Sequence, residues 1–254
     1  MSVTTGAGWR LEPAVGIWIV AGGCWSLLIM LALTGVNHPG HEVVAVHATA
    51  TGLDGARPFL SGWLVMVGAM MLPIVALDVR RLAARAPAGG PVGVVLAVFV
   101  GVWAAFGMAA LAGDTQVHHV VEQREWLGQR PALVLAGAFA LAGAVQLGSL
   151  WSPTLAAVRH RRVFPSSPAD FGGPDAWRAG LRYGAASLVC DGPLMFVMFA
   201  VGLDHLGMMA AVTAVMLAER HERWRSGVAT ITGWALVVAA GVVAMPTLIG
   251  GAAG

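Results

Sequence analysis

Lysine is absent from this chain, and charged residues of all kinds make up only 11 % of its 254 residues. Soluble domains carry about 25 % charged residues, so the polar surface is too small for a soluble globule of this length. Gly-rich phosphate loops and nucleotide-binding fingerprints are also absent, and we expect no nucleic-acid partner. The two cysteines, Cys24 and Cys190, both fall inside apolar segments and are too few for a disulfide framework.

Apolar residues make up 57 % of the chain and gather in long segments. A helix that crosses about 30 Å of hydrocarbon needs about 20 mostly apolar residues, and seven segments approach this pattern. They are Ala14–Val36, Gly62–Leu77, Val92–Ala112, Ala132–Leu150, Ala185–Leu203, Gly207–Ala218 and Val228–Ile249. We predict an all-α, polytopic transmembrane helical bundle with seven spans, forming one integral membrane domain over residues 1–254. Because the sixth segment is short, six spans are the alternative.

The 15 arginines divide unevenly between the two sides that seven spans create. With the N-terminus in the cytoplasm, twelve arginines are cytoplasmic and three, Arg57, Arg124 and Arg130, are extracytoplasmic. The positive-inside rule then predicts a multi-pass protein of the inner (plasma) membrane with a cytoplasmic N-terminus. The outer side carries six carboxylates against three arginines, so it should attract cations.

Six of the eight histidines fall on this outer side, in three short segments. They are His38, His41 and His47 in the first segment, His118 and His119 in the second, and His205 in the third. Glu122 follows the adjacent pair by three and four residues, so on a helix these three side chains share a face. Imidazole and carboxylate together suit zinc, copper(II), iron or nickel.

These seven side chains are therefore our predicted metal ligands, with copper as the first choice of ion and zinc as the second. We expect the first two outer segments to converge on one ion. For each single histidine, a hydrogen bond to a loop carbonyl or a lipid headgroup is the alternative.

Twelve methionines supply a softer donor, because thioethers select copper(I). Methionine also fills irregular gaps between helices, and we expect most of these side chains to do so. Only Met208 and Met209, which follow His205 closely, are candidate soft ligands.

Asp191 is the polar residue that most needs a partner, because a carboxylate near the middle of a span costs about 2.5–3.5 kcal/mol. We expect it to face the bundle interior, with Gln146 of the fourth span as a partner. The following Gly192 and Pro193 predict a broken helix that lines a polar site. The alternative is a protonated, purely structural carboxyl group.

Several different short motifs follow one another along the chain from the second span onward. Trp63 is followed by Ala69-Met70-Met71-Leu72-Pro73. Further motifs are Ala142-Gly143-Ala144-Val145-Gln146, Gly180-Leu181-Arg182-Tyr183-Gly184, Leu194-Met195, Gly202, Met209 and Glu219-Arg220. In this order they resemble an uncharacterised bacterial family of predicted metal-binding integral membrane proteins with a Trp…Ala-Met-Met-x-Pro signature. The resemblance implies a helical membrane protein that binds metal. That family's cysteine motifs are largely missing here, so its cysteine-based site does not carry over.

Together, these features predict an integral membrane protein that binds copper or zinc at an extracytoplasmic histidine-rich face, for metal handling or transport. One alternative is a non-catalytic accessory subunit of a membrane complex. Another is a histidine-ligated membrane metalloenzyme, an oxidase or hydroxylase, although the sequence offers no acid/base pair or nucleophile to complete a mechanism. The expected partners are the lipid bilayer and either a membrane complex or a second copy of the chain.

Overall fold

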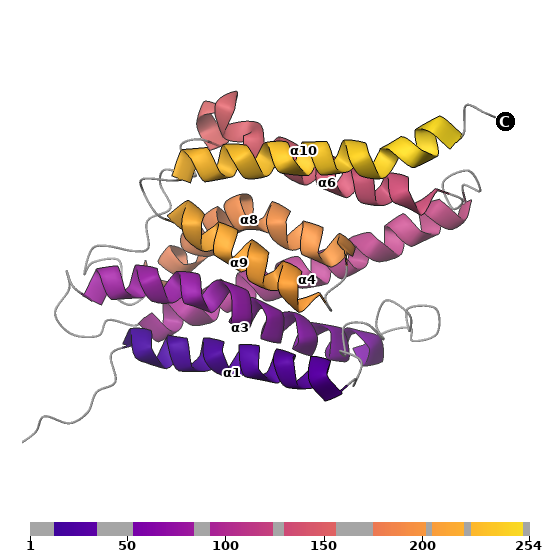
Figure 1. The fold of residues 1–254 in the computed structure, drawn as a ribbon. Coiled ribbons are helices and arrows are strands. Elements are labelled where there is room, and N and C mark those ends of the chain that lie inside the picture. The colour runs from indigo at the N-terminus through magenta and orange to yellow at the C-terminus, as the bar shows by residue number, and fades with distance from the viewer. Residues whose placement is uncertain are drawn as a thin grey trace, which may run out of the picture.

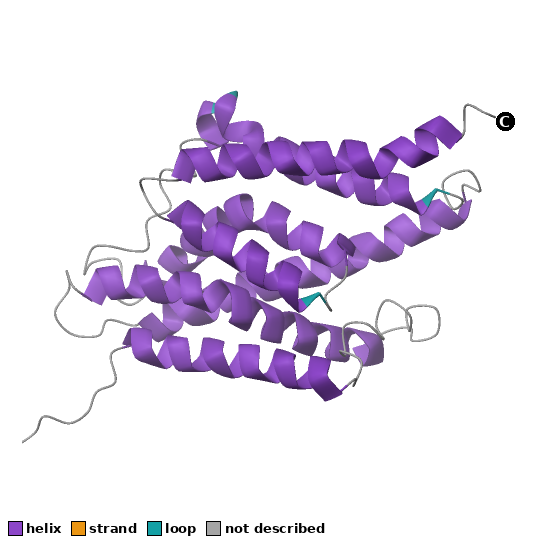
Figure 2. Ribbon diagram, in the orientation of Figure 1, coloured by secondary structure: helices purple, strands orange, loops and turns teal. Residues whose placement is uncertain are grey.

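The computed structural model describes residues 13–34, 53–83, 92–123, 130–155, 175–201, 205–220 and 225–250. Within these ranges the chain is helical and contains no strand (Figure 2). The helices are α1 (Pro13–Thr34), α3 (Leu53–Ala83), α4 (Val92–Gln123), α6 (Pro131–Leu147), η1 (Gly148–Leu150), α8 (Asp175–Val201), α9 (Leu206–Arg220) and α10 (Arg225–Gly250). The prediction of an all-helical chain is confirmed for this part of the molecule.

Consecutive long helices run in alternating directions and pack as a bundle (Figure 1). Helix α1 packs against α3 at one edge, and α10 packs against α6 at the other. Between them α8 contacts α4, α6 and α9, while α3 contacts α4 and α9. The start of α1 and the end of α10 therefore lie at opposite ends of the bundle (Figure 1).

In the part of the chain that the structure describes, four helices are long and apolar enough to cross a membrane. The apolar stretches are Ala14–Thr34 in α1, Ala56–Arg80 in α3, Val92–Gly113 in α4 and Gly227–Ile249 in α10, and α6 adds the shorter Ala132–Leu147. The predicted count of seven spans is not confirmed. Helix α8 contains several charged residues, and the 15 residues of α9 extend only about 22 Å.

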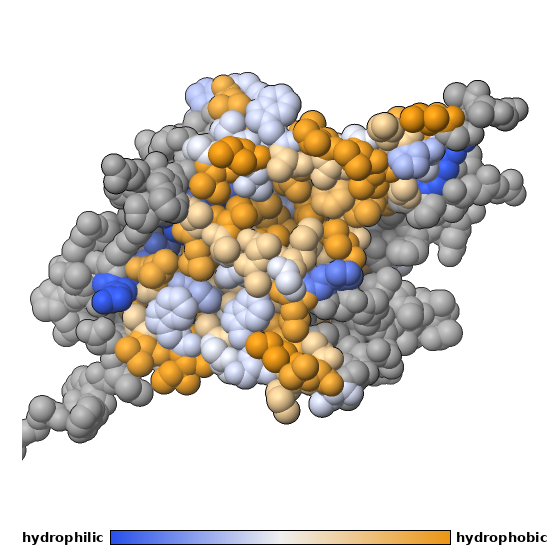
Figure 3. All heavy atoms as spheres, viewed as in Figure 1, coloured by the Kyte–Doolittle hydropathy of each residue, from blue (hydrophilic) through white to orange (hydrophobic). Residues whose placement is uncertain are grey.

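The two edge helices leave large apolar side chains uncovered. On α1 these include Ile19 and Leu33, and on α10 they include Ile231 and Leu248. Figure 3 shows apolar residues over most of the described surface on one face, with few hydrophilic ones. Soluble monomers rarely expose contiguous apolar patches larger than a few hundred Å², so these outer faces suit contact with lipid.

The contact between α3 and α4 is built around a tryptophan. The Trp63 indole is fully buried and donates a hydrogen bond from Nε1 to the backbone oxygen of Trp103 at 2.8 Å. Its ring also lies 5.9 Å from the ring of Phe106, centroid to centroid. Gly107 makes room for this indole, because a Cβ atom at that position would collide with Nε1 and Cδ1 of Trp63.

Gly107→Ala should therefore destabilise the bundle, since the added methyl group must displace an indole that is fixed by a hydrogen bond. Overpacking of this kind costs about 1–3 kcal/mol. Thermal unfolding of the detergent-purified protein measures the loss. Gly101→Ala on the same helix is the matched control, because a Cβ atom there meets nothing within 4 Å. Equal unfolding temperatures for the two variants would contradict the described packing.

Candidate functional site

Arg220, the last residue of α9, lies between two carboxylates from two other helices. Its Nη1 is 2.8 Å from Oδ2 of Asp78 on α3, and its Nη2 is 3.3 Å from Oδ2 of Asp191 on α8. The side chains of Arg220, Asp78 and Asp191 are 5 %, 8 % and 0 % exposed. We call these three residues the arginine cluster. It fastens α3, α8 and α9 together at one level of the bundle.

Hydroxyl groups on α8 also lie against both carboxylates. The Tyr183 hydroxyl donates to Oδ2 of Asp78 at 2.7 Å, and the Ser187 hydroxyl donates to Oδ2 of Asp191 at 2.8 Å. Tyr183, Ser187 and Asp191 are spaced four residues apart, so they share one face of α8. The guanidinium carbon of Arg220 also lies 6.0 Å from the centroid of the Tyr183 ring, which is within cation–π range.

A second buried polar pair lies next to the arginine cluster. Gln146 on α6 donates from Nε2 to Oε1 of Glu219 at 2.8 Å, and both side chains are buried. Gln146 was expected to serve as a partner of Asp191, and this bond connects it to Glu219, the neighbour of Arg220. Helix α6 is thereby joined to α9 in the same region.

The structure confirms one expectation about Asp191 and corrects another. Its side chain faces the interior, as expected. The predicted helix break after it is wrong, because α8 runs without interruption from Asp175 to Val201 with Pro193 inside it. Neighbouring helices and local adjustments can satisfy the backbone groups that a proline frees in such a helix.

Arg220 is one of the twelve arginines that the count assigned to the cytoplasmic side, and it meets Asp78 here. Both are buried in the bundle. The physical reason is their pairing, because the guanidinium of Arg220 lies against the carboxylates of Asp78 on α3 and Asp191 on α8. A short apolar segment that ends in two adjacent charges, Glu219 and Arg220, is the sequence signal that could have revealed this.

Only part of the predicted histidine site falls on described residues. His38, His41 and His47 lie outside them. His118, His119 and Glu122 lie on the last turns of α4, which continues 11 residues beyond the expected end of that span, although their side chains are not described. His205 is exposed and precedes α9, where its backbone oxygen accepts a hydrogen bond from the Met209 amide.

The described helix ends that flank the predicted outer segments lie together. The C-terminal ends of α1 and α4 and the N-terminal ends of α3 and α9 lie at the same end of the bundle (Figure 1). Convergence of the outer segments on one ion stays a prediction. In the described ranges, no group of three or more His, Cys, Asp or Glu side chains could hold a metal ion.

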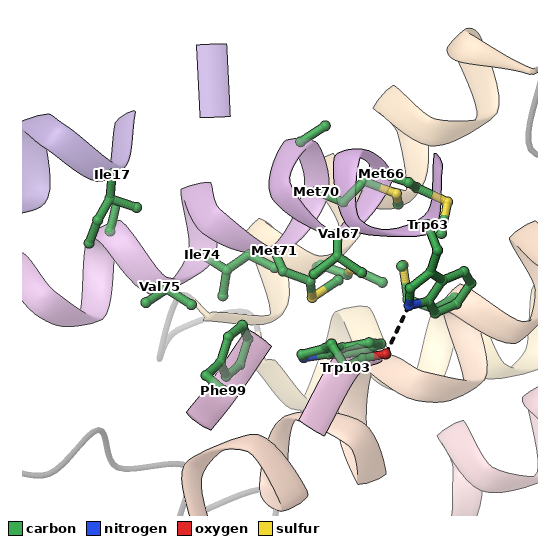
Figure 4. Close-up of a cluster of buried hydrophobic side chains, with 14 of the residues drawn as sticks. Ile17, Trp63, Met66, Val67, Met70, Met71, Ile74, Val75, Phe99 and Trp103 are labelled. Atoms are coloured by element: carbon green, nitrogen blue, oxygen red, sulfur yellow. Dashed lines mark hydrogen bonds between the residues drawn. The ribbon is translucent and has the colours of Figure 1, made fainter. Parts of the chain in front are cut away.

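Seven buried methionines form a further feature of the interior. They are Met66, Met70 and Met71 on α3, Met195 and Met198 on α8, and Met209 and Met216 on α9, each at most 2 % exposed and all part of one core cluster. We call this set the methionine layer. Figure 4 shows its α3 members beside the indoles of Trp63 and Trp103. Of the two candidate soft ligands, Met209 is fully buried and Met208 is half-buried.

The described chain is thus a helical bundle with apolar outer helices and a buried cluster of charges. Residues 60–243 match the model of the PpoB2 family, whose members are described as copper chaperones. Because the match covers more than half of the chain, the protein belongs to this family. The matched range contains α4, α6, α8 and α9 and all three residues of the arginine cluster. No curated protein and no solved structure matches the chain.

Removing the guanidinium alone should be costly, because two buried carboxylates then lose their shared partner. Breaking a buried ion pair by deleting one member costs about 3–5 kcal/mol, so Arg220→Met should lower the unfolding temperature clearly. The triple variant Arg220→Met, Asp78→Asn and Asp191→Asn leaves no buried charge in the cluster and should recover part of the loss.

Thermal unfolding in detergent measures both variants, with Arg178→Met as the control. Arg178 pairs with Asp175 at 3.4 Å, and both side chains are more than half exposed, so this change should be nearly silent. If Arg220→Met were as mild as Arg178→Met, the structural role of the arginine cluster would be refuted.

Proposed function

We propose that this chain is a copper chaperone set in the membrane, which binds copper and passes it to an acceptor. The observation that carries the proposal is the match of residues 60–243 to a family of copper chaperones. Copper is accordingly the first choice of bound ion and zinc the second. Copper is cargo in this account, so the protein needs a site that holds the ion and a route by which the ion leaves.

The proposed setting is a multi-pass arrangement in the inner membrane, with seven spans and a cytoplasmic N-terminus. Among the described residues, four helices are apolar and long enough to cross a membrane. The charged helices α8 and α9 contact α3, α4 and α6, so their buried charges face protein, as charges at membrane depth must. Without Arg220, eleven arginines remain on the proposed inner side against three on the outer side, which still favours this orientation.

The proposed loading site is the set of outer histidines with Glu122. Helix α4 runs to Gln123, so the backbone puts His118, His119 and Glu122 on one helix at the spacing that lets them share a face. His205 precedes α9 at the same end of the bundle (Figure 1). Imidazole and carboxylate are suitable ligands for copper(II) and zinc, and the excess of carboxylates on this side attracts cations.

The double variant His118→Gln and His119→Gln should lower copper affinity. Even changes in the second shell of a metal site cost about 10–100-fold in affinity, so losing two ligands should cost at least about tenfold. Competition titration of the detergent-purified protein with a copper chelator measures this. The control is His160→Gln with His221→Gln, which replaces the two histidines assigned to the inner side. Equal affinities for the two double variants would remove the outer site.

The seven-span arrangement makes its own prediction about the C-terminus. Fusing an alkaline phosphatase reporter to the C-terminus should give an active enzyme, because that reporter works outside the cytoplasm and an odd number of spans places the C-terminus there. Green fluorescent protein at the same position, exported unfolded, should be dark. The reverse pattern, a bright fluorescent fusion with an inactive phosphatase, would show an even number of spans.

A further inference from the structure

Each of the three helices fastened by the arginine cluster also carries methionines on its buried side. On α8, Met195 and Met198 continue the stripe of Ser187 and Asp191 at intervals of four and three residues. On α9, Met209 and Met216 lie eleven and four residues before Arg220, again at helical spacing. The same faces that converge on the guanidinium therefore present thioethers further along.

All seven methionines lie on one side of the arginine cluster. From the arginine cluster, the methionines lie toward the N-terminal ends of α3 and α9 and toward the C-terminal end of α8. These three helix ends lie together (Figure 1). At a rise of about 1.5 Å per residue, Met195 and Met216 lie about 6 Å from the level of the cluster and Met71 about 10 Å. Met209 and Met66 lie about 16 and 18 Å away. The methionine layer thus occupies the depth between the arginine cluster and the end that bears His205.

We infer that the methionine layer binds copper(I) inside the bundle, as an interior site distinct from the outer histidines. This inference rests on the proposed copper-handling function and adds an oxidation state and a ligand type to it. Thioethers are soft ligands that select copper(I) and disfavour harder ions such as zinc. The ion enters as copper(I), which the outer imidazoles can also bind, so no electron transfer is needed between the two sites.

Buried indoles add to the suitability of the layer for a cation. Trp63 and Trp103 are fully buried in the same core cluster as the seven methionines. Indole is the aromatic group that attracts cations best, and the attraction grows when water is excluded. Figure 4 shows both rings next to the methionines of α3. A monovalent ion among thioethers and indoles keeps a low charge in an apolar interior, which a divalent ion would not.

Core packing alone would also place methionine in this position, because the side chain adapts to irregular gaps. The two roles differ in their response to leucine, which matches methionine in size and costs less than about 1.5 kcal/mol as a core replacement. Leucine preserves packing and removes sulfur. A packing role predicts unchanged copper binding, and a ligand role predicts its loss.

The test uses the full-length, detergent-purified protein, titrated with copper(I) under anaerobic conditions against bicinchoninate as the competing chelator. The background variant carries glutamine at His38, His41, His47, His118, His119 and His205, so that the outer site does not contribute. In this background, Met71→Leu, Met195→Leu and Met216→Leu together should lower copper(I) affinity at least about tenfold, since smaller changes around metal sites cost about 10–100-fold. The control is Met30→Leu with Met245→Leu, two exposed methionines on the edge helices, which should leave the affinity unchanged.

X-ray absorption at the copper edge gives a readout that does not depend on the methionine variants. Sulfur scatterers around copper(I) in the histidine-free background are the expected result. If copper binds to the wild type through nitrogen and oxygen alone, or if the leucine variant binds as tightly as its background, the interior site is overturned while the outer site and the proposed function stand. If the wild type binds no copper in either oxidation state, the proposed function fails as well.

Discussion

The guanidinium of Arg220 between Asp78 and Asp191 is the constraint on which the described bundle most depends. A charge taken out of water must be paired and hydrogen-bonded, or the desolvation cost of several kcal/mol per ion is not recovered. Here each carboxylate accepts one hydrogen bond from the guanidinium of Arg220 and one from a hydroxyl group. These directional bonds fix the rotation and depth of α3, α8 and α9 relative to one another more strictly than apolar packing alone could.

The same constraint organises the functional account. The three helices meet at the level of the arginine cluster, and their buried methionines lie on one side of that level, in the depth between the arginine cluster and the end that bears His205. Histidines at the end of the bundle suit copper as it arrives, and thioethers suit copper(I) in a dry interior. A chaperone must release its ion as well as bind it, and weak, soft ligands of exchangeable geometry serve that purpose better than a closed set of thiolates.

The sequence predicts those properties that depend on residues close together in the chain, and it does not predict contacts between distant segments. Apolar segments and the interior position of Asp191 follow from composition and from the cost of burying a charge, and the structure agrees. The ion pair between Asp78 and Arg220 joins residues 142 positions apart. No pattern in the sequence around either residue predicts this pairing. The predicted break of the helix at Pro193 was wrong. Groups on neighbouring helices can satisfy the backbone around a proline, and the local sequence does not show them. The apolar stretch of α4 ends at Gly113, one residue beyond the expected Ala112, and the helix continues through polar residues to Gln123.

The most direct test of the account is the metal content of the wild-type chain, purified in detergent from the membranes of cells supplied with copper. Elemental analysis should find copper in near-stoichiometric amount with the protein and in clear excess over zinc. Copper no higher than in a mock purification from cells that lack the chain would contradict the account.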